Sequence, residues 1–157
     1  MSDFIDNFSR EVMRSGLCSW SSMRGCWGFE IRDLEARFNI QLPTLYKDFL
    51  KKMGKGAGKF MQGTDFFYKG LFSNREAMEE VLELDGQPFV LGKNVFVFSS
   101  HQGYIFHFFD NAKDVHDPPV YGYEEGNLKY DLIDDKFSDF LLNILKHQKQ
   151  EWSQSIN

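Results

Sequence analysis

The stretch "NVFVFSSHQGYIFHFFD", residues 94–110, constrains the fold more than any other part of the chain. It predicts two strands around a tight turn, because β-branched and aromatic residues flank a short polar segment. Half-exposed strands alternate apolar and polar side chains, since neighbouring side chains point to opposite faces. Here both parities are apolar: Phe96 and Phe98 lie on one face, and Val95 and Val97 on the other. Both faces must therefore be covered, by the chain itself or by a partner.

Apolar residues at helical spacing predict five helices around this hairpin. Pro43 is placed in the first turn of the third helix, and Gly54 at its left-handed C-terminal position. "SNRE", residues 73–76, has the form of a capping box, and Asp134 or Asp135 is expected to cap the last helix. The expected helices span residues 2–16, 29–38, 43–53, 73–84 and 135–146, and the polar tail, residues 148–157, is expected to fray.

Strands are expected between the helices. Short strands are predicted within residues 58–72, and "VYGYEEGNLKYDL", residues 120–132, predicts a second hairpin with its turn at residues 125–127. This order predicts an α+β fold, with a mainly antiparallel sheet of about five or six strands backed by helices. The chain has 157 residues and no long linker, so a single domain over residues 1–157 is expected.

The two faces of the hairpin lead to different expectations. Phe96 and Phe98 should face the helices within residues 29–53 and 135–146. The other face should meet the N-terminal helix, a partner, or the loop "GLCSWSSMRGCWG", residues 16–28. The two Trp residues of this loop, Trp20 and Trp27, are costly to expose. Docking onto the core is the simpler interpretation for them, and a partner surface is the alternative.

The net charge of −5 is concentrated in one segment. Residues 110–139 hold 3 Lys or Arg and 9 Asp or Glu, a balance of −6, whereas residues 1–109 hold 13 of each. A solvated acidic surface is the simpler interpretation. The sharper one is a landing site for a basic partner, because Tyr121, Tyr123 and Tyr130 lie among these charges, as aromatic residues do in interface hot spots.

Several classes of function find no support in the sequence. No apolar run approaches the roughly 18 residues of a membrane helix, and the acidic N-terminus is unlike a signal peptide, so a cytoplasmic location is expected. Aromatic residues interleaved with acids disfavour nucleic-acid binding. "GKGAGK", residues 54–59, is not a phosphate loop, because Phe60 stands where a hydroxyl is required. The spacing of Cys18 and Cys26 fits no common zinc pattern.

Catalysis is not expected either. There is no G-x-S-x-G motif, no HExxH motif and no local Cys–His pair, so neither a metal nor a cofactor is predicted. His107 lies in mid-strand among Phe residues, where a packed histidine is the simpler interpretation. The alternative is an enzyme or small-ligand site in which His107 meets Tyr104 and Tyr123 in a pocket.

The segment "FEIRDLEARFNIQLPTLYKDFLKKMGKG", residues 29–56, resembles the N-terminal signature of the SUKH superfamily, the SMI/KNR-like proteins. The residues that carry the resemblance are Ile31, Leu34, Glu35, Ile40, Leu42, Pro43, Tyr46, Phe49, Leu50 and Gly54. "NVFVFSSHQGYIFHFFD", "PPVYGYEEG" and "DKFSDFLLNIL" follow in the order of the family's later elements, so the resemblance covers roughly residues 28–146. One departure is "MGKGAGKF", where the family often has an Asn-Gly-Gly turn.

The resemblance implies a SUKH-like fold with no catalytic residues. Many bacterial members are similar to immunity proteins that neutralise a cognate polymorphic or contact-dependent toxin, often a nuclease, and fungal relatives are regulatory interaction proteins. We therefore expect an immunity protein that binds a basic cognate toxin, with a regulatory or scaffolding module as the alternative. The expected partner-binding residues are Trp27, His101, Tyr104, Asp110, Asp114, Asp117, Tyr121, Tyr123, Glu124 and Glu125.

Overall fold

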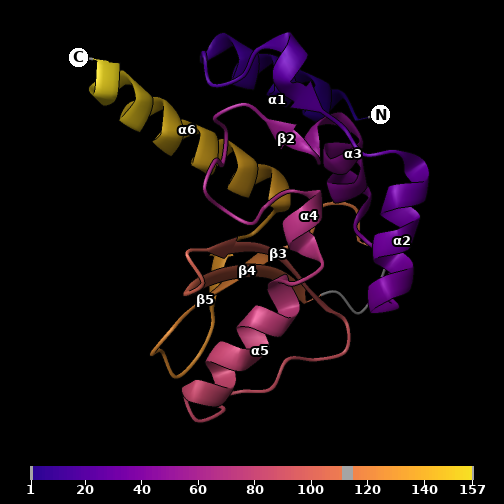
Figure 1. Cartoon of the computed structure of the whole chain (residues 1–157), viewed down its shortest axis with the longest axis vertical. Coiled ribbons are helices and arrows are strands. Elements are labelled where there is room, and N and C mark those ends of the chain that lie inside the picture. The colour runs from indigo at the N-terminus through magenta and orange to yellow at the C-terminus, as the bar shows by residue number, and fades with distance from the viewer. Residues whose placement is uncertain (1, 111–114, 157) are drawn as a thin grey trace.

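The hairpin of residues 94–110 forms the first two strands of a four-stranded antiparallel sheet. The structure, a computed structural model, describes residues 2–110 and 115–156 (Figure 1). Its elements are α1 (Asp3–Arg14), η1 (Trp20–Ser22), β1 (Met23–Arg24), α2 (Gly28–Phe38), α3 (Thr44–Met53), β2 (Gly56–Ala57), α4 (Tyr68–Leu71), α5 (Asn74–Leu84), β3 (Val95–His101), β4 (Ile105–Asp110), β5 (Val120–Glu124), β6 (Asp131–Asp134) and α6 (Phe137–Ile156). The predicted α+β class is confirmed.

The strands are divided between two sheets. The main sheet has the strand order β3-β4-β5-β6, and β1 pairs with β2 in a small separate ribbon. The prediction of strands within residues 58–72 is wrong, because this segment consists of turns and the short helix α4. Gly58, Met61 and Gly63 have φ values of 62°, 54° and 85°, which bend the chain away from an extended course.

The face of the sheet that carries Phe96 and Phe98 packs against α2, α3 and α6, as predicted. Phe96 lies 5.5 Å from the ring of Phe38 in α2 and 5.7 Å from that of Tyr46 in α3. The Phe98 ring lies 5.7 Å from that of Phe137 in α6. The buried aromatic rings between the sheet and these helices therefore form the main core.

The opposite face is covered by the chain's own helix α5, which the sequence-based alternatives did not include. Met78 and Leu82 of α5 are buried against Val97, Phe108 and the neighbouring strand β5. Figure 1 shows α5 on one side of the sheet and α6 on the other. Apolar residues of both parities in β3 thus reflect a sheet covered on two sides by helices of the same chain.

The ends of α3 differ from the prediction. Pro43 occupies the N-cap position rather than the first turn, and Gly54 has a right-handed φ of −65°. Gly54 is needed for close approach instead, because a Cβ there would lie 2.6 Å from the carbonyl oxygen of Leu50 and 2.7 Å from Sγ of Cys26. The capping box at Ser73 is also absent, since the Ser73 side chain makes no cap hydrogen bond to α5.

The C-terminal tail is helical rather than frayed. Helix α6 has 20 residues and continues to Ile156. Its later turns are held by the loop after β2: the side-chain oxygen of Gln148 accepts a hydrogen bond of 3.1 Å from the backbone N–H of Met61. The ammonium of Lys59 also lies 4.0 Å from the centre of the Trp152 ring. Although α6 is long, neither it nor any other helix in the described ranges has the apolar length that crossing a bilayer requires.

Candidate protein-binding surfaces

The structure places the predicted partner-binding residues in three separate regions. The first is the end of the sheet where both hairpins turn, because the backbone N–H of Glu125 donates a hydrogen bond of 2.9 Å to the carbonyl oxygen of Tyr104. The second is the opposite end of the sheet, where Asp110 ends β4 and Asp117 precedes β5. The third is Trp27, which precedes α2. Asp114 lies outside the described residues.

At the turn end, His101 and Tyr104 are half-buried, and Glu124 and Glu125 are exposed. The His101 ring lies 6.2 Å from that of Tyr104, and its Nδ1 is 3.2 Å from the Thr64 hydroxyl. These contacts bring a small acidic and aromatic group together at the turn end of the sheet.

Tyr123 is a core residue and is not available to a partner, so this part of the prediction is corrected. Its hydroxyl donates a hydrogen bond of 2.5 Å to the Asp85 carboxylate, which also accepts one of 2.9 Å from the backbone N–H of Gly126. Burial, together with the Asp85 carboxylate, raises the pKa of Tyr123 to about 12. Tyr121 is half-buried, and its ring stacks 5.9 Å from that of Phe108.

Asp117 has a structural role that its sequence context does not reveal. Its carboxylate accepts hydrogen bonds from the backbone N–H of Ser138, at 2.9 Å, and from the Ser138 hydroxyl, at 2.5 Å. The start of α6 is thus capped by Asp117, which corrects the expectation that Asp134 or Asp135 does so. The Asp134 carboxylate instead accepts a hydrogen bond of 2.7 Å from the side-chain amide of Asn143.

Asp117→Ala is therefore expected to lower the free energy of unfolding by about 1–2 kcal/mol, because it leaves the first turn of α6 without its acceptor. Urea unfolding followed by circular dichroism measures this change. Asp110→Ala is the matched control, since that carboxylate is exposed, and it should change stability by less than about 0.5 kcal/mol. Equal losses in the two variants would contradict the capping role.

The two Trp residues of the loop are exposed, so the expectation that they pack onto the core is wrong. Trp20 is 78% exposed and Trp27 is 67% exposed. The loop backbone approaches α3 so closely that a Cβ at Gly25 would lie 1.7 Å from the carbonyl oxygen of Lys51. The backbone N–H of Cys26 also donates a hydrogen bond of 2.8 Å to the last turn of α3. This backbone contact leaves the bulky side chains outside.

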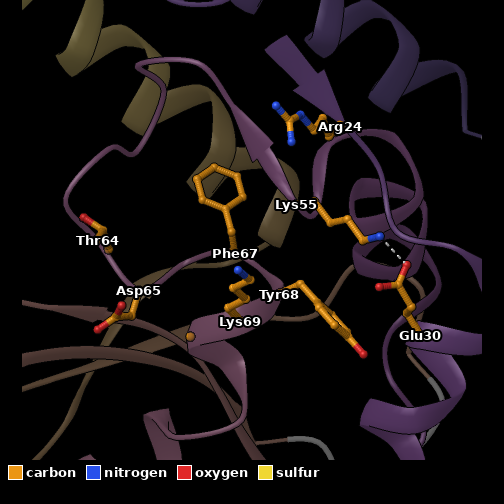
Figure 2. Close-up of a pocket in the computed structure, with 9 residues that line it drawn as sticks. Arg24, Glu30, Lys55, Thr64, Asp65, Phe67, Tyr68 and Lys69 are labelled. Carbon is orange, nitrogen blue, oxygen red and sulfur yellow. Dashed lines mark ion pairs between the residues drawn. The ribbon is translucent and has the colours of Figure 1, made fainter.

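A pocket of about 540 Å³ lies between β1, α2 and α4, and we call it the cationic pocket (Figure 2). It is lined by Arg24, Glu30, Lys55, Thr64, Asp65, Phe67, Tyr68, Lys69 and Gly70. The Glu30 carboxylate lies 2.7 Å from the ammonium of Lys55 and accepts a hydrogen bond of 2.8 Å from the backbone N–H of Trp27. These two contacts lower the pKa of Glu30 and keep it ionised.

A second hollow, of about 450 Å³, lies between β6 and the first turns of α6, and we call it the β6 groove. It is lined by Leu132, Ile133, Asp134, Asp135, Asp139, Leu142 and Asn143. Strand β6 is the last strand of the sheet, and no strand in the described ranges pairs with its outer side. Leu132, Ile133 and Leu142 are 54%, 45% and 47% exposed. Apolar side chains and carboxylates thus share one open surface.

The β6 groove was not predicted from the sequence. Leu132 is the last residue of the hairpin predicted over residues 120–132, Ile133 lies just beyond it, and Leu142 lies within the predicted last helix. Ile133 packs over Gly122, where a Cβ would lie 2.7 Å from the Ile133 side chain. The clustering of Asp134, Asp135 and Asp139 could have been anticipated only from the overall charge of residues 110–139.

The possibility of a catalytic or small-ligand site around His107 is contradicted. The His107 ring lies 5.0 Å from that of Phe140 in the core, and burial lowers its pKa to about 4. Tyr104 lies in the turn and Tyr123 on the other face of the sheet, so the three do not meet. Burial, followed by the charge of Glu30, raises the pKa of the Cys26 thiol to about 12. No group of metal-ligating side chains was found in residues 2–110 and 115–156.

Residues 29–141 match a known protein family whose description is SUKH_6: SMI1-KNR4 cell-wall. The matched range begins in α2 and ends in the first turns of α6, so it contains the complete main sheet, α3 and α5. It also contains most of the residues that line the two hollows, except Arg24 of the cationic pocket and Leu142 and Asn143 of the β6 groove. No curated protein matches the chain.

Proposed function

Because the chain belongs to the SMI1-KNR4 family of the SUKH superfamily, we propose that it is an immunity-type protein. It binds a cognate polymorphic or contact-dependent toxin in the cytoplasm and neutralises it without catalysis. The toxin surface that it covers is basic, as the substrate-binding surface of a nuclease is.

The β6 groove is the observation that supports this function best. Exposed carboxylates surround apolar side chains on an unpaired sheet edge, which is the composition of an interface with an apolar centre and a charged rim. Asp131, Asp135 and Asp139 are exposed and are available to Lys or Arg on a partner. Burial raises the pKa of Asp134, and the neighbouring Asp139 and Asp135 charges add to this, while Asn143 opposes it. Positive charge brought by a partner would relieve this repulsion.

The apolar part of the groove adds affinity that charge alone does not give. A partner side chain that covers Leu132 and Leu142 removes apolar surface from water, which contributes about 25 cal/mol for each Å² buried. The carboxylates act earlier, because they attract a basic partner before contact and thereby raise the association rate. Tight and fast binding is what neutralising a toxin requires.

The variant Asp131→Asn, Asp135→Asn, Asp139→Asn tests this proposal. Its association rate with the toxin encoded beside the chain should fall about tenfold at 50 mM salt, and the salt dependence of that rate should become flatter. Surface plasmon resonance at several salt concentrations measures both quantities. Removing three carboxylates weakens the attraction but leaves the fold intact, because all three side chains are exposed.

The matched control is Glu76→Gln, Glu80→Gln, Glu83→Gln on α5, which removes the same charge from another exposed face. Its association rate should stay within about threefold of that of the unchanged protein. Equal rates for the two triple variants would remove the β6 groove from the mechanism. A stable complex that leaves the toxin fully active would instead favour the regulatory or scaffolding role.

A further inference from the structure

Two exposed aromatic side chains belong to residues close in sequence to Glu30, which lines the cationic pocket. Trp27 is 67% exposed and Phe29 is 57% exposed, and both lie at the start of α2. Aromatic rings bury 150–250 Å² each when they are covered, so leaving two of them in water forgoes a large stabilisation. Trp27 adjoins the pocket, because its backbone N–H donates a hydrogen bond to Glu30 in the pocket wall.

The pocket also holds two cations, Arg24 and Lys69, that no described carboxylate pairs with. Arg24 and Lys69 make no ion pair with any residue in the described ranges, whereas Lys55 is paired with Glu30. Figure 2 shows Arg24, Lys55 and Lys69 entering the pocket region from three different segments. The other carboxylate of the lining, Asp65, lies with Thr64 on the side away from Arg24 (Figure 2). An anionic group from outside would therefore be favoured near Arg24 and Lys69.

We propose that this surface binds an acidic, extended segment of a protein partner. A carboxylate of the segment lies between Arg24 and Lys69, and a neighbouring apolar side chain packs on Trp27 and Phe29. Charge complementarity selects the acidic partner, and the exposed rings explain why a peptide fits better than a small anion, which would leave them uncovered. Trp, Tyr and Arg are the residues that dominate protein interfaces. Arg24 and Tyr68 line the pocket, and the Trp27 backbone is hydrogen-bonded to Glu30 in its wall.

The proposed site is independent of the β6 groove. The residues next to the pocket pair with the outer side of β3, since the backbone N–H of Asp65 donates a hydrogen bond of 2.9 Å to the carbonyl oxygen of Ser100. The β6 groove lies at the opposite edge of the sheet. The two surfaces differ in charge and in position, so both can be occupied at once, and each can be tested without the other.

An array of nine-residue peptides that combine Asp or Glu with Leu or Phe tests the proposal, with Lys-containing peptides as counterparts. Acidic peptides should bind, and the best of them should shift the indole N–H signal of Trp27 in a nitrogen-15 NMR spectrum, assigned with Trp27→Phe. Arg24→Gln with Lys69→Gln should weaken this peptide about tenfold or more in fluorescence anisotropy. Arg37→Gln with Lys93→Gln removes two exposed charges elsewhere and should leave binding within about twofold.

Several results would overturn the proposal. These are equal or better binding of Lys-containing peptides, unchanged affinity in the Arg24 and Lys69 double variant, or no saturable binding of any acidic peptide. Inorganic phosphate that shifts the Trp27 signal as strongly as the peptide would indicate a small-anion site instead. The protein could also self-associate through these two surfaces. If self-association were lost in the Arg24 and Lys69 double variant and also in the β6-groove triple variant, the occupant would be a second copy of the chain, which contradicts the proposal. Whether a variant still binds the toxin tests the proposed function and not the peptide-binding proposal.

Discussion

Phe98→Ala is expected to lower the free energy of unfolding by about 4 kcal/mol. The Phe98 side chain is fully buried and lies at the centre of the main core. Its ring stacks 4.4 Å from that of Phe109 in β4 and meets Phe140 of α6 edge-on at 5.3 Å. Removing the ring loses its transfer free energy and leaves a cavity between sheet and helices that these rigid neighbours cannot fill.

Urea unfolding at pH 7.5 measures this loss, and two further variants make it specific. Phe98→Leu keeps most of the volume and should cost less than about 2 kcal/mol. Phe29→Ala removes the same ring from a position that is 57% exposed, and should change stability by less than about 0.5 kcal/mol. A loss at Phe98 no larger than that at Phe29 would show that the sheet and α6 do not share one core.

The parts of the fold that local sequence determines were predicted well. Helix α2 follows from the apolar stripe of Ile31 and Leu34, and both residues are buried. The hairpin β3–β4 follows from its aromatic strands and its polar turn. What covers the Val97 face could not be predicted, because the same apolar parity would suit a helix of the chain or a partner. Only the position of α5 in three dimensions shows that a helix of the chain, and not a partner, covers this face.

Contacts between distant segments account for the errors in the fold. The polar sequence after Lys146 gives no local reason for a helix, yet Gln148 and Trp152 contact the loop at Lys59 and Met61. The apolar residues of "DFFYKGLF", residues 65–72, are equally compatible with a strand and with the observed turn and short helix. Secondary structure in such segments is decided by tertiary packing rather than by propensity.

For the candidate surfaces, the sequence identified the right segment but not the individual residues. The charge balance identified residues 110–139 as the acidic region, and the β6 groove lies within it except for its last two residues. The charge balance could not distinguish Asp117, which accepts hydrogen bonds from Ser138 at the start of α6, from Asp135 and Asp139, which are exposed. A carboxylate is available to a partner only when no residue distant in sequence donates a hydrogen bond to it. Such donors cannot be identified from the sequence alone.

Lowering the pH from 7.5 to 4.5 is expected to remove about 2.5 kcal/mol of stability through His107 alone. Burial against the core, together with the charge of His101, lowers the pKa of His107 from 6.5 to about 4 in the folded chain. Between pH 6.5 and pH 4, His107 is protonated in the unfolded state but not in the folded state. The unfolded state is therefore stabilised relative to the folded state as the pH falls. The contribution is therefore complete above about pH 6.5 and is lost progressively toward pH 4.

Other groups also titrate in this range, so the measured quantity is the difference between the unchanged protein and His107→Phe. Any constant packing cost of the Phe ring cancels, because each variant is compared with itself at the two pH values. His107→Phe should lose about 2.5 kcal/mol less on acidification than the unchanged protein. His147→Gln, at an exposed position of α6, should keep the full pH dependence. Identical pH dependence in the His107 variant and the unchanged protein would mean that the His107 ring reaches water and is not packed between the sheet and α6.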